Sequence, residues 1–232
     1  MRCYNGSINN NRKGKGKRIV MIKPICYILG AGDSYDRQIS VGEKDYIICA
    51  DGGLRNSHIF SRSPDLIVGD FDSLGEIPQI ENIEVYPPEK DDTDMLIAIK
   101  KGLKRGYKTF VILGALGGER ADHSIANIQN LAYICEQGGR GFILHNNTVF
   151  TAIKDAELKF SKDCKGYISV FSLRDESKGI YLKNLKYELN GQSLFSSNPM
   201  GVSNEFTGKE ASISVKEGIL LVTFNGSIED VG

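Results

Sequence analysis

Six short apolar runs between residues 25 and 145 constrain the fold more than any other feature of the chain. They are continuous rather than alternating, and most are rich in β-branched residues and closed by Gly or Asp. The runs are ICYILG (25–30), DYIICADGG (45–53), DLIVGD (65–70), IEVYP (83–87), TFVILG (109–114) and GFILH (141–145). Because strands that are buried on both faces of a parallel sheet have this pattern, the runs predict a mostly parallel sheet.

Two amphipathic stretches between these runs predict helices. Residues 93–105 place apolar side chains on one face and basic side chains near the C-terminal end, where they favour the helix dipole, and Gly106 follows as a stop. Residues 123–137 have an apolar side that begins at Ile125, and Gly138 comes after their end. Strands and helices in alternation indicate a doubly wound α/β domain.

The sequence divides into three regions. Residues 1–23 are polar, basic and rich in Gly and Asn, which predicts a mostly disordered leader without the apolar core of a secretory signal. Residues 24–147 form the predicted α/β domain. Residues 148–232 contain short alternating runs separated by turn residues, which predict an all-β sandwich or barrel. The expected fold class is therefore an α/β domain followed by an all-β domain.

Charge and cysteine usage argue against several classes of function. The 29 basic and 29 acidic residues give a formal net charge of zero, so no global field recruits nucleic acid or a membrane. No apolar run approaches the roughly 18 residues of a membrane-spanning helix. The five cysteines and three histidines are scattered, which disfavours a zinc site and suits free thiols in a reducing compartment, the cytoplasm.

Five aspartates lie in two short segments, GDFDS (69–73) and KDDTD (90–94). Asp70 and Asp72 follow a predicted strand. Residues two apart in an extended chain point to the same side, so both carboxylates are expected to face the crevice at the carboxyl end of the sheet. KDDTD begins the predicted helix, and Asp91 or Asp92 could be its N-cap. Capping accounts for only one of these side chains.

A divalent cation is the simplest explanation for like charges that converge from two loops. Mg²⁺ is usually held by one or two protein carboxylates together with water and substrate phosphates. The segment ADGG (50–53) adds Asp51 at another strand end, beside glycines that allow a ligand to come close. The acidic segments therefore predict a Mg²⁺–nucleotide site at the carboxyl ends of the strands.

A third segment, LGALGGERADHSIAN (113–127), leads from a strand into a helix. Its Gly-rich turn can offer backbone N–H groups to an anion, and Arg120 could bind phosphate oxygens in a bidentate manner. A plain strand–helix loop with Asp122 as the N-cap explains the same residues equally well.

In this order, ADGG, GDFDS, KDDTD, LGGERADHSIANI and the later GVSNEF (201–206) resemble the motifs of thiamine pyrophosphokinases over about residues 25–226. The resemblance implies that an intact pyrophosphoryl group passes from ATP to the hydroxyl of thiamine, giving AMP and thiamine diphosphate. It also implies a Mg²⁺-dependent enzyme that is usually a homodimer, with thiamine bound where the subunits meet.

The resemblance also assigns roles to individual residues. The catalytic set consists of Asp70, Asp72, Asp94, Arg120 and Asp122, of which Asp70, Asp72 and Asp94 are the metal ligands. The ATP-binding set consists of Asp51, Gly52, Ser73, Lys90, Asp91, Thr93 and Arg120. The thiamine-binding set consists of Asp122, Ser203, Asn204 and Phe206. Animal and fungal members carry a Trp beside the thiamine, whereas this chain has none, so Phe206 and Phe224 are the candidates to pack on its rings.

Three other functions fit parts of the pattern. A D-x-D phosphatase carries its motif on the first strand, whereas here the motif follows the third. A Mg²⁺- or Mn²⁺-dependent nucleotide-sugar transferase also uses D-x-D, but it has no need of the Ser-Asn segment on a separate β domain. A non-catalytic module that senses nucleotide or thiamine would tolerate the loss of an acidic ligand, and here all the matching aspartates are present.

Overall fold

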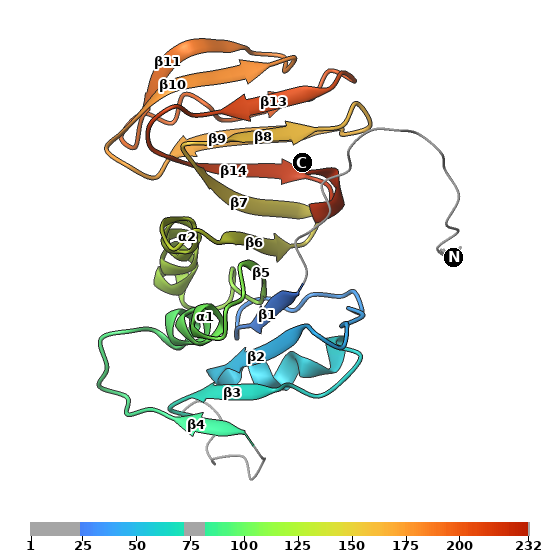
Figure 1. Ribbon diagram of the computed structural model, residues 1–232, viewed down its shortest axis with the longest axis vertical. Coiled ribbons are helices and arrows are strands. Elements are labelled where there is room, and N and C mark those ends of the chain that lie inside the picture. Colours follow the sequence, from blue (N-terminus) through green and yellow to red (C-terminus); the bar gives the residue numbers. More distant parts are fainter. Residues whose placement is uncertain (1–23, 72–81, 232) are drawn as a thin grey trace.

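The computed structural model describes residues 24–71 and 82–231. The predicted leader and two predicted site residues, Asp72 and Ser73, lie outside these residues. Within them the chain forms a ten-stranded sheet and a four-stranded sheet (Figure 1). No helix in this part of the chain is long and apolar enough to cross a membrane.

One half of the larger sheet is parallel, as the sequence predicts. Its strands are β1 (Ile25–Leu29), β2 (Tyr46–Ala50), β3 (Leu66–Gly69), β4 (Ile83–Val85), β5 (Thr109–Leu113) and β6 (Arg140–His145). Every neighbouring pair among them is parallel. The residues of β1, β3 and β5 are buried along their whole length, which explains why these runs lack alternation.

The other half of this sheet is antiparallel. Its strands are β7 (Thr148–Lys154), β9 (Tyr167–Ser172), β12 (Asn204–Glu205) and β14 (Ile219–Asn225). The chain turns tightly at Asn146 and Asn147, and β7 then pairs with β6 in antiparallel register. The sheet thus continues across the predicted boundary between the two domains.

The four-stranded sheet covers this antiparallel half. It contains β8 (Glu157–Phe160), β10 (Glu176–Lys183), β11 (Leu189–Phe195) and β13 (Ala211–Ser214) in the order β11-β10-β13-β8. Buried apolar side chains from both sheets, such as Leu158, Ile180, Val222 and Phe224, pack between them. The C-terminal part therefore has the layered β architecture expected from its alternating runs, with only the short 3₁₀ helix η3 (Ile228–Asp230) added.

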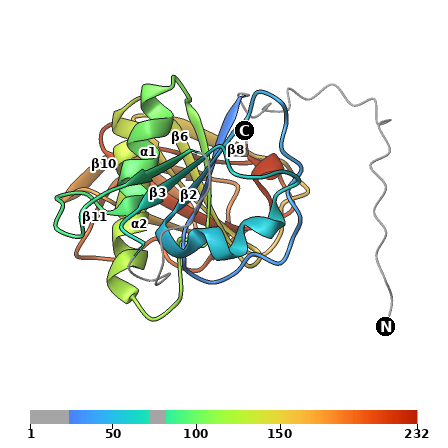
Figure 2. The ribbon, with the colours of Figure 1, turned by 90° about the horizontal axis from the view of Figure 1, so that it is seen from below.

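Helical segments cover both faces of the parallel half, as Figure 2 shows. The helices α1 (Asp94–Lys104) and α2 (Ala121–Glu136) pack on one face, and the 3₁₀ helix η1 (Asp51–Ile59) packs on the other. Both α-helices match their predicted ranges closely. The N-cap of α1 is Thr93, whose hydroxyl accepts the Leu96 N–H at 3.2 Å, so the prediction of an aspartate cap is wrong.

The order of the strands creates a switch point at β1. The strand pairs with β2 on one side and with β5 on the other, so the chain builds the sheet outwards in both directions from it. In open parallel sheets the loops at such a point diverge and leave a crevice for ligands at the carboxyl ends of the strands. The segments ADGG, GDFDS and LGGERAD follow β2, β3 and β5 and therefore begin at these ends.

Candidate active site

The loops that follow β1 and β5 are joined by backbone hydrogen bonds beyond the end of the sheet. Gly32 N–H donates to the Gly114 carbonyl at 2.8 Å, and Asp33 N–H donates to the Leu116 carbonyl at 2.9 Å. The glycines allow this close approach, because a Cβ on Gly32 would overlap the carbonyl oxygens of residues 114 and 116. The two loops at the switch point therefore form one unit.

The Asp33 carboxylate continues this connection to the turn before α2. Its Oδ1 accepts the Gly118 N–H at 3.0 Å, and its Oδ2 lies 4.0 Å from His145 Nε2. The Gly117 N–H donates to the Ser124 hydroxyl at 3.2 Å. These two N–H groups are already bonded within the protein, so they do not offer the free anion-binding donors that the Gly-rich turn suggested. Sequence reasoning missed Asp33, because it lies in no recognised motif.

Two predicted carboxylates converge on one cation. Asp70 follows β3 and Asp94 is the first residue of α1, and Lys90 Nζ lies between them at 2.9 Å from Asp70 Oδ2 and 3.1 Å from Asp94 Oδ1. The three side chains are mostly buried, with 14%, 20% and 13% of the side chain exposed for Asp70, Asp94 and Lys90. The structure therefore brings together two of the three predicted metal ligands, and it places Lys90, whose predicted role is ATP binding, between them.

The electrostatics of this cluster show that negative charge exceeds positive charge. Burial raises the pKa of Asp94, the nearby ammonium of Lys90 opposes that rise, and the carboxylates of Asp70 and Asp51 add to it. For Lys90, burial acts to lower the pKa, but its contacts with Asp70 and Asp94 outweigh burial and the pKa is raised. A further cation near Asp94 would therefore favour its charged form.

The donor set suits a hard divalent cation. Oxygen atoms from two separate loops already point at a single cation about 3 Å away, and Asp94 Oδ1 is buried without accepting a well-aligned hydrogen bond from any described residue. Residues 24–71 and 82–231 contain no group of three acidic, His or Cys side chains arranged around a common point. Asp72, the third predicted ligand, lies outside those ranges.

The backbone after β3 turns sharply at Phe71. This residue has a φ of 60° while its side chain is buried at 2% exposure in the core beneath η1. Positive φ is rare for a bulky residue and commonly marks a functional turn. Phe71 is therefore not extended, as the prediction for residues 70–72 required, and Asp72 itself lies outside the described residues.

The ADGG segment lies close to the acidic cluster. Asp51 has a φ of 45° and begins η1, and a Cβ on Gly69 of β3 would lie only 2.9 Å from the Asp51 Cα. Gly52 is buried, as is Gly53, which packs against the Leu29 carbonyl. The glycines thus serve close packing between the ends of β1, β2 and β3, and this packing brings Asp51 within electrostatic range of Asp94.

Some residues of the KDDTD segment belong to the charged cluster, and the others lie at the surface. Asp92 pairs with Lys100 at 2.5 Å on the exposed side of α1, and Asp91 is exposed. Thr93 serves as the helix cap. Only the first and last residues of the segment, Lys90 and Asp94, belong to the charged cluster.

Arg120 and Asp122 form an exposed pair at the start of α2. The guanidinium donates from Nε to Asp122 Oδ1 at 3.0 Å and from a terminal nitrogen to Oδ2 at 2.7 Å. Its hydrogen bonds lower the pKa of Asp122 to about 2. Arg120 itself is the N-cap residue, and Asp122 lies in the first turn. More than 60% of each side chain is exposed, so the pair is open to a ligand.

Three of the four predicted thiamine residues, Ser203, Asn204 and Phe206, lie in or beside β12, at the far edge of the larger sheet. Asn204 is buried, and its amide bonds to the Tyr187 backbone in both directions, accepting the N–H at 2.9 Å and donating to the carbonyl at 2.6 Å. Ser203 beside it is exposed and has a φ of 59°. The Asn204 side chain therefore shapes the segment, and Ser203 is the residue that faces solvent.

Aromatic side chains surround this edge. Phe224 is 1% exposed and packs on Phe160 in the core, so it is a core residue and not a platform for a ligand. Phe206 is partly exposed and also contacts Phe160, with ring centroids 5.2 Å apart. Tyr167 and Tyr187 are about 60% exposed beside Ser203 and Asn204. Sequence reasoning missed both tyrosines, because no motif marks them.

The two groups of predicted residues are far apart within one chain. Seven strands separate β12 from β3 in the larger sheet as described. Neighbouring strands are about 4.8 Å apart, so the eight spacings place β12 roughly 38 Å from β3. Within a single chain, the Ser203 segment and the Asp70–Asp94 cluster therefore cannot contact the same small molecule.

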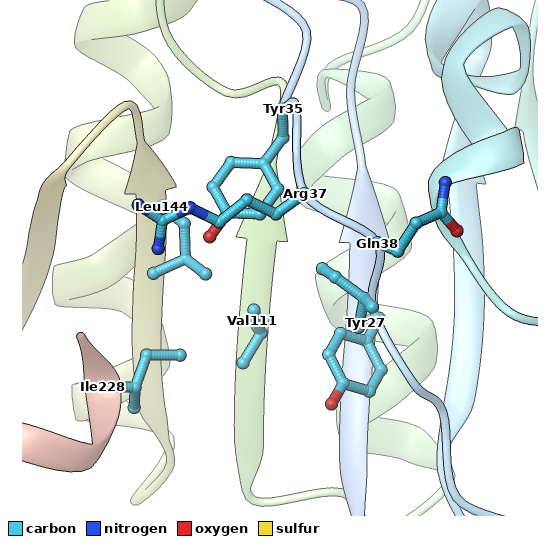
Figure 3. Close-up of a pocket in the computed structure, with 8 residues that line it drawn as sticks. Tyr27, Tyr35, Arg37, Gln38, Val111, Leu144 and Ile228 are labelled. Atoms are coloured by element: carbon cyan, nitrogen blue, oxygen red, sulfur yellow. The ribbon is translucent and has the colours of Figure 1, made fainter. Parts of the chain in front are cut away.

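Two adjoining cavities lie elsewhere, on the face of β1, β5 and β6 opposite α1 and α2. The first, of about 230 Å³, has Tyr27, Val111 and Leu144 along its floor and Tyr35 and Arg37 above it (Figure 3). The second, of about 300 Å³, extends it past Leu144 towards residues 146–149. None of the described predicted site residues lines either cavity, so the predicted chemistry lies at the strand ends and not in these hollows.

Comparison with known proteins finds two family models that match successive segments of the chain. The model for the catalytic domain of thiamin pyrophosphokinase matches residues 27–141, and the model for its vitamin B1 binding domain matches residues 155–220. Thiamine pyrophosphokinase of Bacillus subtilis (strain 168) is 30% identical over 161 residues, which cover 66% of this chain and 75% of that protein.

Solved structures share the fold. The crystal structure of thiamine pyrophosphokinase from Bacillus subtilis superimposes with a TM-score of 0.75 at 22% identity, covering 88% of this chain and 100% of that one. The thiamin pyrophosphokinase from Candida albicans gives a TM-score of 0.59 at 17% identity, covering 87% and 88% of the two chains. At these identities the likeness concerns the fold alone.

Proposed function

Because the chain belongs to the thiamine pyrophosphokinase family, we propose that it transfers the pyrophosphoryl group of ATP to the hydroxyl of thiamine with the help of Mg²⁺. Membership of this family makes the chain an ATP-dependent diphosphotransferase. The observation that supports the site most directly is the convergence of Asp70 and Asp94 on one cation beside the switch point of the sheet. The products are thiamine diphosphate and AMP.

The protein contributes to this reaction mainly by aligning the two substrates and neutralising the phosphate charge. The thiamine hydroxyl loses its proton as its oxygen attacks the β-phosphorus of ATP, and the bond from that phosphorus to the oxygen that bridges it to the α-phosphorus breaks, so AMP leaves with that oxygen. Asp70 and Asp94, with Asp72, would hold Mg²⁺, which neutralises phosphate charge when it is bound. The negative excess of the cluster also favours the cationic thiazolium ring of thiamine.

Arg120 is, with Lys90, a candidate for neutralising the remaining phosphate charge. Its guanidinium is exposed at the start of α2, and its fork geometry fits two phosphate oxygens as it now fits the two oxygens of Asp122. When the Arg120 guanidinium binds phosphate instead of Asp122, the Asp122 carboxylate can accept a hydrogen bond from thiamine or pair with its positive charge. This exchange of partners gives a role in substrate binding to both Arg120 and Asp122.

We place the thiamine-binding segment of one copy against the acidic cluster of another in a homodimer. The separation of roughly 38 Å within a single chain is the reason, since one ligand cannot span it. Tyr167, Tyr187, Met200 and Val202 are exposed around Ser203. An apolar surface of this kind favours a protein partner, and burial between copies would also let a tyrosine or Phe206 pack on the thiamine rings.

The four thiols of Cys26, Cys49, Cys135 and Cys164 are free, and three of them are buried. Burial raises the pKa of Cys49 to about 12, so its thiol is unreactive. These features support the proposal that the enzyme works in the reducing cytoplasm.

Incubation with ATP, Mg²⁺ and thiamine followed by chromatography tests the proposed reaction. AMP and thiamine diphosphate are expected to rise in equal amounts, and chelation of the metal is expected to stop both. Formation of ADP or inorganic phosphate in step with product would contradict the transfer of an intact pyrophosphoryl group.

A further inference from the structure

The ammonium of Lys90 occupies the position between the two metal-side carboxylates. It lies 2.9 Å from Asp70 and 3.1 Å from Asp94, at the end of the loop that leads into α1. We propose that Lys90 is an internal counter-ion that holds Asp70 and Asp94 together before the divalent ion binds and then competes with that ion for them. This inference rests on the metal site of the proposed function, and it adds a role for a residue of this chain.

The burial of the cluster makes such a counter-ion necessary. Each of the three side chains keeps only 13–20% of its surface exposed, so water screens their charges poorly. Asp51 adds a further negative charge within electrostatic range of Asp94. Without Lys90, these carboxylates from two separate loops would repel each other more strongly, and their burial would make that repulsion costly. An ammonium on the preceding loop removes this cost in the metal-free enzyme.

The same contact opposes binding of the metal on its own. A divalent ion ligated by Asp70 and Asp94 would lie beside the ammonium, so Lys90 has to move away from at least one carboxylate. Mg²⁺ gains additional ligands when substrate phosphates are present, and those phosphates also offer the displaced ammonium a new partner. Metal and nucleotide are therefore expected to bind together more readily than the metal alone.

Titration calorimetry with Mn²⁺ alone, on the full chain without nucleotide, tests the competition. Lys90→Gln is expected to tighten Mn²⁺ binding by about tenfold or more, because it removes the competing charge. Lys90→Arg keeps the charge and is expected to bind as the wild type does. Lys100→Gln removes a lysine from the exposed pair with Asp92 and serves as the matched control. Equal or weaker Mn²⁺ binding by Lys90→Gln would overturn the proposal.

Thermal unfolding gives a second readout that does not depend on activity. In chelator, Lys90→Gln is expected to melt below the wild type, and Mn²⁺ is expected to raise its melting temperature by more than it raises that of the wild type. If Lys90→Gln is unfolded in chelator, Lys90→Met is measured in its place, because methionine retains the apolar stem of the lysine side chain. Folding of either variant only when Mn²⁺ is added would support the proposal, and unfolding of both with Mn²⁺ present would contradict it.

The outcome separates this inference from the proposed function. A wild-type chain that makes thiamine diphosphate and AMP, while Lys90→Gln binds Mn²⁺ no better, leaves the function standing and removes the role of Lys90. A wild-type chain that forms no thiamine diphosphate and binds no Mn²⁺ even with ATP would remove the proposed function itself.

Discussion

At the scale of single residues, we expect substitution of Asp94 to have the largest effect on turnover. It has a raised pKa in a cluster with Asp70, Lys90 and Asp51, and Asp94→Asn removes its charge while keeping its shape. We expect turnover to fall by at least about 100-fold, because charge neutralisation at the phosphates supplies much of the rate. Steady-state assays of thiamine diphosphate formation measure the loss.

Asp92→Asn is the matched control for this change. Asp92 lies two residues away in the same segment, but it pairs with Lys100 on the surface, so its loss is expected to change turnover little. Normal turnover of Asp94→Asn with an unchanged Mg²⁺ requirement would rule out the metal role of Asp94.

Asn204 is a motif residue whose side chain holds the local backbone in place. Its buried amide satisfies the N–H and carbonyl groups of Tyr187 and also accepts the Glu205 N–H at 2.9 Å. Asn204→Ala would leave these groups unsatisfied and is expected to lower the free energy of unfolding by about 1–3 kcal/mol. Because the Ser203 segment would loosen, the KM for thiamine is expected to rise more than kcat falls.

Urea denaturation and thiamine kinetics check this expectation, with Ser203→Ala as the comparison. Ser203 is exposed, so its substitution is expected to change the stability by less than about 0.5 kcal/mol. Full stability of Asn204→Ala would show that the amide has no structural role, and equal weakening of ATP and thiamine binding would point to a general folding defect.

At the scale of elements, hydrophobic patterning predicted the parallel strands and both α-helices, because burial on two faces and the 3.6-residue period leave clear signals. It did not predict η1, which has no such period, or the turn at Phe71, whose positive φ has no sequence signature. It also placed Ile125 on the apolar side of the second helix, whereas that side chain is 62% exposed. The buried face of α2 instead includes Asn127, whose side-chain amide donates to the Ala115 carbonyl at 2.7 Å. Apolar patterning does not predict a buried polar residue of this kind.

The connection of the β1 and β5 loops gives a prediction at this scale. Asp33→Ala removes the acceptor for the Gly118 N–H and frees the turn that leads to Arg120, so kcat/KM for ATP is expected to fall by about tenfold. Asp33→Asn keeps an acceptor oxygen and is expected to stay within about threefold of the wild type. Kinetics at varied ATP concentration distinguish the two variants.

Asp36→Ala tests whether the effect belongs to the connection or to the loss of a charge. Asp36 is exposed in the same loop, and its substitution is expected to leave kcat/KM for ATP near the wild-type value. If Asp33→Ala behaves as Asp36→Ala does, the turn before α2 does not depend on Asp33.

At the scale of the whole molecule, the sequence predicted both halves of the site but not the distance between them. The motifs identify Asp70, Asp94, Arg120 and Ser203 locally, whereas their separation depends on strand order, which is set by pairings distant in sequence. The continuous pairing of β6 with β7 joins the two predicted domains through one extended sheet. That extension places the Ser203 segment roughly 38 Å from β3, by the spacing of strands.

A subunit-mixing experiment tests the central claim that each active site combines the acidic cluster of one copy with the Ser203 segment of another. Asp94→Asn disables the first part, and Ser203→Arg places a positive charge against cationic thiamine in the second. Each variant alone is expected to be nearly inactive. In an equal mixture after subunit exchange, half of the dimers combine the two variants, and each of these has one intact site, so about a quarter of wild-type activity is expected. A mixture that is no more active than either variant alone would contradict the account.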